Sequence, residues 1–234
     1  MRKIGLIGGM SWHSTMEYYR IINDAVSTQR GGHHSARIAL ESVDFDEVRA
    51  LQLAEDWDGA GRLLGDAGRR LAASGADVVL ICTNLMHKVA PAVESAIDVP
   101  LLHIADAVAE EALAQGADTL GLLGADWVMR ERFYADRLAR HGIRTLTPEE
   151  PDRAIVDRVI FDELTRGVIR DESRAEYARI IEQLAARGAQ AVVLACTEIG
   201  LLVGSDDSPI PVIDSAHAHA AAAARLALEA ALAS

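Results

Sequence analysis

The two cysteines of the chain lie in two copies of one short phrase. Residues 78–84 read VVLICTN, with Cys82 at the end of the apolar run, and residues 192–198 read VVLACTE, with Cys196 at the same place. In each copy a buried strand is expected to end at a thiol, a hydroxyl, and an amide or a carboxylate. Polar groups at the carboxyl end of a strand are typical of an active site, and a thiol there can act as a nucleophile or move a proton. The duplication predicts two similar halves that face each other across one cleft.

Cys196 is the residue whose surroundings favour chemistry. Its thiol ends an expected strand just before a possible helix N-terminus, which would stabilise the thiolate. Such a thiolate would serve as a nucleophile or as a base for proton transfer. A free cysteine is also often a small buried hydrophobe. The matching copy at Cys82 and Thr83 favours the functional interpretation.

Several polar residues near the thiols have both a functional and a structural interpretation. His87 lies four residues after Thr83, so it would orient a group of the site from the same helix face, or be an ordinary helix histidine. Asn84 would bind a carboxylate or cap the helix that follows. Glu198 would hold a substrate ammonium group or be an acid favoured by the dipole at a helix start. His103 would line the cleft or pack in the core, and the sequence leaves these alternatives open.

Gly8 and Gly9 end the first expected strand. They lack the G-x-G-x-x-G spacing of a dinucleotide site, so a tight strand-to-helix turn explains them. Backbone N–H groups of residues 10–12, after this turn, would bind a carboxylate. The sequence contains no Walker motif and no G-x-S-x-G elbow. Lysines are few, and Lys88 lies in an expected helix, which argues against a Schiff base.

Composition narrows the class of protein. The chain has 234 residues, of which 50% are hydrophobic and 4% aromatic, and its formal net charge is −12. A core with few aromatic residues suits layered α/β packing, and the net negative charge argues against nucleic-acid binding. Two distant cysteines make neither a disulfide framework nor a zinc site, so we expect no metal and a reduced, cytoplasmic location. The first apolar run is too short for a signal peptide, and no stretch of about 18 apolar residues predicts a membrane span.

Strands and helices alternate along the chain, which predicts parallel sheets. Expected strands cover residues 3–7, 38–43, 78–82, 100–104, 119–123, 143–146, 191–195 and 211–213. Expected helices begin at Ser14, with a capping box to Glu17, and then cover residues 57–74, 105–114, 129–141, 154–165, 172–187 and 216–233. IGLIGGM near the start is echoed by LGLLGAD in the second half. We therefore expect two similar α/β lobes, residues 1–115 with the tail 214–234, and residues 116–213.

Four segments together resemble the cofactor-independent aspartate/glutamate racemase family over nearly the full length of the chain. They are IGLIGGMSW near the start, CTNLMHK in the middle, LLHIADA after it and CTEIGLL near the end. They look closest to the branch of L-aspartate/glutamate-specific or broad-range amino-acid racemases. The resemblance implies two parallel-sheet lobes related by pseudo-twofold symmetry with the active site between them. It also implies an amino-acid substrate, no cofactor and, as often in the family, a homodimer.

In most of the family two cysteines flank the substrate α-carbon, one removing the α-proton as a thiolate and the other donating a proton from the opposite face. Cys196 matches the second cysteine. The first cysteine of the family belongs to a pattern that Asn84 and His87 match, and this alignment puts Thr83 at the position of that cysteine. Aligning the two Cys-Thr phrases instead would put Cys82 there. We favour Thr83, because neighbours on a strand cannot both face the cleft. A hydroxyl is a far poorer base than a thiolate, so the resemblance implies a kinetically asymmetric racemase.

The resemblance also implies which residues bind the substrate. They are Met10 through its backbone, Gln52 at the side-chain carboxylate, Asn84, Leu85, Gly124, Thr197 and Glu198, with His87 and Cys82 as supporting residues. Ala125 stands where the family usually has a threonine, which removes one hydroxyl contact. Hydrogen bonds to the substrate carboxylate must stabilise the carbanion, because no pyridoxal is expected. Two other functions stay open: a decarboxylase of the same superfamily with one reactive cysteine, and a ligand-binding protein without catalysis.

Overall fold

The computed structural model describes residues 1–232 and divides the chain into two compact units. Unit 1 consists of Met1–Ile104 and the segment that begins at His219, and unit 2 of Ala105–Ala218. Helix α5 (Ile104–Ala114) therefore goes almost entirely with unit 2, whereas the sequence placed residues 105–115 in the first lobe.

The sheet of unit 1 has four parallel strands in the order β2-β1-β3-β4. The strands are β1 (Lys3–Gly8), β2 (Arg37–Ser42), β3 (Val78–Ile81) and β4 (Leu101–Leu102). Strand β3 and nearly all of β1 are buried, which suits continuous apolar runs in the middle of a parallel sheet. The edge strand β4 is shorter than the predicted strand 100–104.

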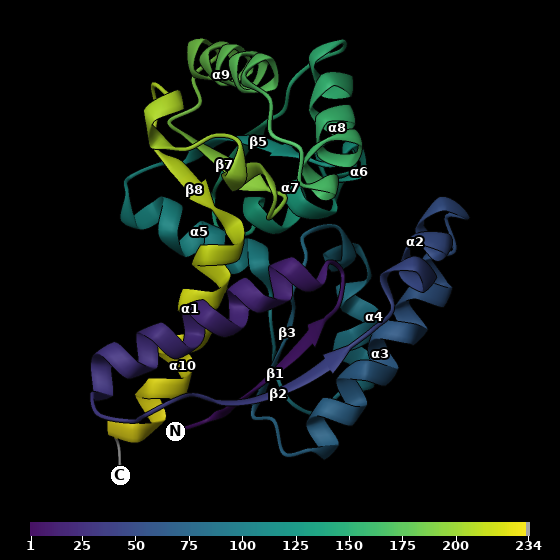
Figure 1. Cartoon of the computed structure of the whole chain (residues 1–234), viewed down its shortest axis with the longest axis vertical. Helices are drawn as coiled ribbons and strands as arrows, with labels where there is room; N and C mark the ends of the chain where they lie inside the picture. Colours follow the sequence, from purple (N-terminus) through teal and green to yellow (C-terminus); the bar gives the residue numbers. More distant parts are fainter. Residues whose placement is uncertain (233–234) are drawn as a thin grey trace. The chain divides into compact units, whose positions relative to one another are not determined.

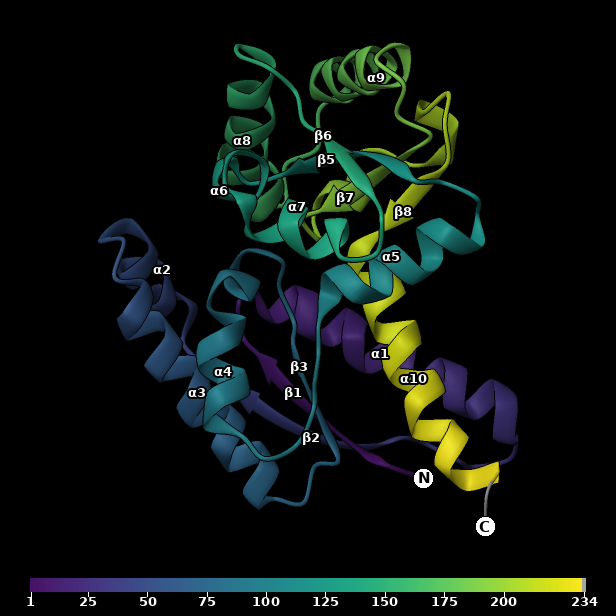
Figure 2. The same ribbon diagram turned by 180° about the vertical axis from the view of Figure 1, so that it is seen from behind.

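Helices cover both faces of this sheet (Figure 1). They are α1 (Trp12–Arg30), α2 (Phe45–Leu53), α3 (Trp57–Ala73), the 3-10 helix η1 (Leu85–Val89), α4 (Ala90–Ala96) and α10 (Ser215–Leu232). Helices α3 and α4 pack over Ile7, Val79 and Ile81, and α1 and α10 lie on the opposite face (Figure 2). The expected helix 216–233 is confirmed over its described residues, and position 233 lies outside them.

Two helix starts in unit 1 differ from the sequence-based expectation. Helix α1 begins at Trp12, because the hydroxyl of Ser11 caps it and accepts a hydrogen bond from the Ser14 N–H at 3.5 Å. The predicted capping box at Ser14 is therefore wrong. Helix α2 was not expected, although Asp44 caps it and accepts from the Asp46 N–H at 3.0 Å.

Unit 2 has the same order of parallel strands, β6-β5-β7-β8. These strands are β5 (Thr119–Gly124), β6 (Arg144–Leu146), β7 (Ala191–Ala195) and β8 (Val212–Asp214). In both units the first strand of the pattern runs beside the second and third, so the repeated order confirms the α/β fold with two similar parallel sheets.

One of the predicted helices of unit 2 is divided into two. Besides α5 they are α6 (Asp126–Arg130), α7 (Arg132–Ala139), α8 (Asp152–Asp162), η2 (Leu164–Arg166), α9 (Asp171–Ala186), η3 (Ile199–Leu201) and η4 (Ser205–Asp207). The predicted helix 129–141 is interrupted, because Glu131 has extended backbone angles of φ −87° and ψ 156°. Within residues 1–232, none of the helices has the length and hydropathy needed to cross a bilayer.

Candidate active site

The carboxyl ends of β1 and β3 bring the predicted residues of unit 1 together. Ile7 of β1 lies beside Ile81 of β3, so Gly8 comes level with Cys82. In unit 2, Gly124 lies directly beside Ala195. Gly8 and Gly124 each end the first strand of their unit, so Cys82 and Ala195 are equivalent positions. The residue that follows is Thr83 in unit 1 and Cys196 in unit 2. Strand register thus makes Thr83, rather than Cys82, the counterpart of Cys196.

Burial separates Cys82 from Thr83. The Cys82 side chain is fully buried, and its N–H donates to the Ile7 carbonyl at 2.9 Å, so the chain is still extended there. This burial raises the pKa of the Cys82 thiol, which therefore stays protonated. The next residue, Thr83, is half-buried. As the alternation of a strand predicts, Thr83 is partly accessible and Cys82 is not.

His87 fixes the backbone that carries Thr83. Its Nε2 accepts a hydrogen bond from the Ile104 N–H at 3.1 Å, so the ring proton lies on Nδ1, which donates to the Thr83 carbonyl at 2.8 Å. Both ring nitrogens are engaged in a neutral imidazole that is buried. The His103 ring lies 4.5 Å from that of His87 between centroids and is also buried.

Asn84 and Leu85 continue this turn and are both buried. Asn84 precedes η1, but its side chain makes no capping hydrogen bond to that helix. The capping alternative is therefore wrong. The amide is held close to Thr83, at the end of β3.

Helix α2 adds an amide and a cation to the same part of unit 1. The Gln52 Nε2 donates to the Met86 sulfur at 3.1 Å, and the Arg49 Nη1 donates to the Gln52 Oε1 at 3.2 Å. Gln52 is buried, and Met86 lies in η1, so this pair touches the turn after β3. Arg49 was missed in the sequence. Its signal is the spacing of three residues to Gln52 on a helix with a good N-cap.

The turn after β1 is tightly packed. Gly9 has φ +95°, and a Cβ there would lie 2.1 Å from the Val43 carbonyl oxygen. Its N–H donates to the Thr15 hydroxyl at 2.9 Å, and that hydroxyl donates to the Ser11 carbonyl at 3.0 Å. The Met10 side chain packs into the core of unit 1. The predicted role of Met10, binding of a carboxylate through its backbone, therefore does not involve its side chain.

Cys196 follows β7 and shares a carboxylate with its neighbour. Its thiol donates to Glu198 Oε2 at 3.2 Å, and the Thr197 hydroxyl donates to the same oxygen at 2.7 Å. Burial and the Glu198 carboxylate raise the pKa of Cys196 well above its ordinary value, and the Asp157 carboxylate adds to the effect. The predicted stabilisation of a thiolate by a helix start is therefore wrong for this state, because a short 3-10 turn and a carboxylate stand there instead.

The turn after β5 lies beside this cysteine in the sheet. A Cβ at Gly124 would lie 2.9 Å from the Ala195 carbonyl oxygen, so the two backbones approach closely. The Asp126 N–H, at the start of α6, donates to Asp157 Oδ1 at 2.8 Å. Asp157, from α8, therefore links the β5 turn to the surroundings of Cys196, a role that the sequence analysis missed.

The predicted residues thus form two groups, one in each unit. Unit 1 brings together Met10, Gln52, Thr83, Asn84, Leu85 and His87. Unit 2 brings together Gly124, Cys196, Thr197 and Glu198.

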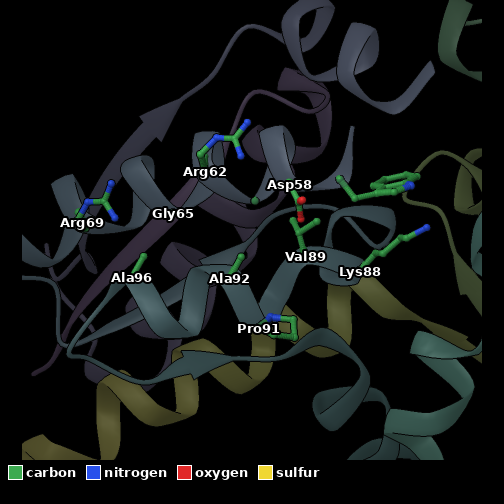
Figure 3. A pocket seen from close by; sticks show the side chains of 11 residues that line it. Asp58, Arg62, Gly65, Arg69, Lys88, Val89, Pro91, Ala92 and Ala96 are labelled. Atoms are coloured by element: carbon green, nitrogen blue, oxygen red, sulfur yellow. The ribbon is translucent and has the colours of Figure 1, made fainter. Parts of the chain in front are cut away.

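A separate cavity of about 480 Å³ lies between α3 and α4 (Figure 3). Its walls combine small residues, such as Gly65 and Ala92, with Trp57, Arg62 and Lys88. Neither Thr83 nor Cys196 lines it. Among residues 1–232, no cluster of three or more His, Cys, Asp or Glu side chains is suited to hold a metal ion.

Comparison with known proteins defines the class to which this chain belongs. The model of the Asp/Glu/hydantoin racemase family matches residues 7–223. The broad specificity amino-acid racemase RacX of Bacillus subtilis (strain 168) is 21% identical over 220 residues, which are 91% of this chain and 92% of that protein. The chain belongs to the Asp/Glu/hydantoin racemase family, whose members are isomerases.

Two solved structures agree with this assignment. A candidate Asp/Glu racemase from Yersinia pestis has a TM-score of 0.93 and 50% identity, with 97% of this chain and 100% of that chain covered. An aspartate racemase homologue from Pyrococcus horikoshii OT3 has a TM-score of 0.83 and 31% identity, with 97% and 99% covered. The resemblance to racemases in the sequence is confirmed.

Proposed function

We propose that the chain is an amino-acid racemase that inverts the α-carbon of aspartate, glutamate or a related polar amino acid without a cofactor. Thr83 and Cys196 act on opposite faces of the α-carbon. The observation that carries this assignment is the strand register: Thr83 lies one residue beyond the position level with Gly8 of β1, and Cys196 lies one residue beyond the position level with Gly124 of β5. The full burial of Cys82 supports it, because a thiol in the core cannot reach a substrate.

The proton transfer begins at Cys196. The thiol loses its proton to solvent, and the thiolate then removes the substrate α-proton. The electron pair of the broken C–H bond moves into the substrate carboxylate, which gives an enediolate. On the opposite face the Thr83 hydroxyl, or a water that it holds, supplies a proton to the carbon and regains one from solvent. General acid–base catalysis of this kind contributes about 10²–10⁴-fold, so the rest of the rate must come from stabilising the enediolate.

The groups around the two catalytic residues supply this stabilisation. Backbone N–H groups at Met10 and the side chains of Asn84 and Thr197 bind the α-carboxylate. Glu198 binds the substrate ammonium, whose positive charge offsets the carboxylate and lowers the pKa of Cys196 toward the range in which the thiolate forms.

Arg49 and Gln52 select the substrate side chain. The Arg49 guanidinium contacts the buried Gln52 amide, and together they offer a cation and a hydrogen-bond donor. A guanidinium is suited to bind a carboxylate in a fork of two hydrogen bonds. The pair therefore favours acidic amino acids over neutral ones.

The assignment can be tested by chiral chromatography of L-aspartate and L-glutamate incubated with the purified protein. We expect the D enantiomer to form, and we expect Cys196→Ala to lose this activity by at least about 10²-fold, the lower end of acid–base catalysis. Cys82→Ala is the matched control and should keep it. Loss with Cys82→Ala and retention with Cys196→Ala would contradict the assignment. Release of CO2 from a malonate by an otherwise inactive protein would point to a decarboxylase.

A further inference from the structure

The cavity between α3 and α4 lies where small residues of the two helices face each other. A Cβ at Gly61 would lie 2.8 Å from the Ala92 Cβ, and a Cβ at Gly65 would lie 3.1 Å from the Ala96 Cβ. Because these side chains are small, the two backbones approach closely and a volume of about 480 Å³ beside the contact stays open. Sites for small molecules typically have volumes of about 300–1,000 Å³ and mostly apolar walls. The cavity therefore has the size of a small-molecule site.

Three cationic side chains are spread along this cavity. Arg69 and Lys88 line its opposite ends, and Arg62 lies between them (Figure 3). The wall that α3 forms runs from Trp57 to Arg69, which is about 18 Å along a helix axis. Among the described residues of the walls, Asp58 alone is acidic. The chain as a whole has a formal net charge of −12, so this excess of cations is a local feature.

The surroundings of Arg62 differ from those of the nearby arginines of α3. Arg69 forms an ion pair with Asp66, and Arg70, which does not line the cavity, pairs with Glu41 at 2.7 Å between Nε and Oε1. Within residues 1–232, the Arg62 guanidinium has neither an ion pair nor a side-chain hydrogen bond. A guanidinium binds a phosphate group well, because two of its N–H groups donate in parallel. Arg62 is therefore available to hold an anion in the cavity.

Lys88 is held in place at its end of the cavity. Its Nζ lies 3.8 Å from the centre of the Trp57 ring, and both residues line the cavity. This cation–π contact limits the movement of the ammonium, so an anion bound there costs less conformational entropy than at a fully exposed lysine. Lys88 also follows His87, which donates to the Thr83 carbonyl, so a ligand at Lys88 would contact the 3-10 helix η1 that carries this turn.

We propose that this cavity binds an organic bisphosphate, a molecule in which a carbon skeleton joins two phosphate groups. One phosphate binds Arg62, with Arg69 beside it, and the other binds Lys88. The carbon skeleton lies over the small apolar side chains of Pro91 and Ala92. Charge favours phosphate, because a phosphate monoester carries about −1.5 to −2 at pH 7, so two of them offset three cations. The length of the cavity favours two groups, because a single phosphate cannot contact cations at both ends.

Calorimetric titration with fructose bisphosphate tests the proposal. We expect it to bind at least about 10-fold more tightly than fructose monophosphate, because the second phosphate binds within the same complex. Arg62→Gln should weaken the binding of fructose bisphosphate by about 10–100-fold, the usual loss when a charged hydrogen-bonding group is removed. Arg70→Gln is the matched control, since it removes the same charge from the same helix outside the cavity, and it should leave the affinity unchanged.

Hydrogen exchange measured by mass spectrometry locates the ligand. Bound fructose bisphosphate should slow exchange in peptides from α3, η1 and α4, and it should leave α2, which carries Arg49, unchanged. Protection of α2 without protection of α3 and α4 would place the anion at Arg49 and overturn the proposal. Absence of binding, equal affinities for the two fructose phosphates, or equal losses in Arg62→Gln and Arg70→Gln would overturn it as well. None of these readouts requires racemase activity, so the proposal is tested separately from the proposed function.

Discussion

At the scale of the residue, the proposed reaction depends on the Cys196 thiol and on the carboxylate of its neighbour Glu198. Cys196 is protonated, because burial and the Glu198 carboxylate raise the pKa of its thiol. The thiol donates a hydrogen bond to Glu198 Oε2, with 3.2 Å between sulfur and oxygen. The reactive thiolate is thus a minor form at neutral pH. Glu198, for which we propose a role in binding the substrate ammonium, thus also favours the protonated thiol.

This gives a pH dependence with a definite sign. A base with a raised pKa becomes active as pH rises, so the rate of α-proton removal should increase into the alkaline range. Glu198→Gln removes the negative charge and lowers the pKa of Cys196, so the rise should move to lower pH, while KM increases because the ammonium loses its partner. Rates across a pH series measure both effects. An unchanged profile would show that Glu198 does not control the thiol.

The second residue-scale prediction concerns the opposite face of the substrate. Thr83→Cys places a thiol where the hydroxyl stands, so removal of the α-proton from the D enantiomer should speed up relative to the L enantiomer. Initial rates from each enantiomer give this ratio, and the equilibrium mixture must remain racemic. Thr83→Ser, which keeps the hydroxyl, is the control and should leave the ratio close to that of the wild type. A ratio that Thr83→Cys does not change would place the second proton donor elsewhere.

At the scale of the element, tight turns after strands hold the reacting groups. Gly9 shows this most clearly, because it has both a positive φ and a backbone oxygen where a side chain would stand. Gly9→Ala should lower the free energy of unfolding by about 1–3 kcal/mol or more. Gly75→Ala is the matched control, since Gly75 has φ +83° but nothing within 4 Å of its Cβ position, and it should cost only about 1 kcal/mol. Urea denaturation of both variants measures the difference. An equal decrease in the free energy of unfolding would mean that the backbone at Val43 shifts at little cost.

Helix α2 carries Arg49 and Gln52, the residues that we propose select the substrate side chain. Arg49→Ala should raise KM for aspartate and glutamate and affect neutral polar amino acids much less, because it removes a charge that only an acidic side chain uses. KM values for the two classes of substrate test this. An equal effect on both classes would assign Arg49 to the folding of the helix.

Parts of this site could be predicted from the sequence. The Cys-Thr phrases located β3 and β7, and the spacing from Thr83 to His87 located the turn. Helix α2 was missed, because it is short and its apolar residues do not repeat over enough turns to stand out. The prediction of a thiolate at Cys196 was wrong, because the Glu198 carboxylate contacts the thiol and raises its pKa. The sequence does not show that this side chain turns back toward Cys196. The exposures of Cys82 and Cys196 also differ although their phrases match, since packing around a strand end decides burial.

At the scale of the whole molecule, the two units share a strand order but different ends of the chain build unit 1. His219 of α10 anchors the returning segment: its Nε2 donates to the Leu102 carbonyl at 2.9 Å, and its Nδ1 accepts from the Tyr18 hydroxyl at 2.9 Å. The ring is fully buried.

His219→Leu should therefore destabilise the protein. It leaves the partly buried Leu102 carbonyl and the buried Tyr18 hydroxyl without this partner, and the buried hydroxyl alone should cost about 1–3 kcal/mol. Thermal unfolding should show the loss, and His217→Leu, at an exposed position of the same helix, is the control. If both variants melt alike, the hydrogen bonds of His219 do not hold the C-terminal helix.

The central claim, that this chain racemises acidic amino acids with Cys196 as the base, is tested most directly by proton NMR in D2O. L- and D-aspartate and L- and D-glutamate are each incubated with the protein, and the α-proton signal is followed. We predict that this signal disappears faster from the L than from the D enantiomer, together with inversion, and that Cys196→Ala abolishes the exchange. Persistence of the α-proton in all four amino acids, or exchange that survives in Cys196→Ala, would contradict the account.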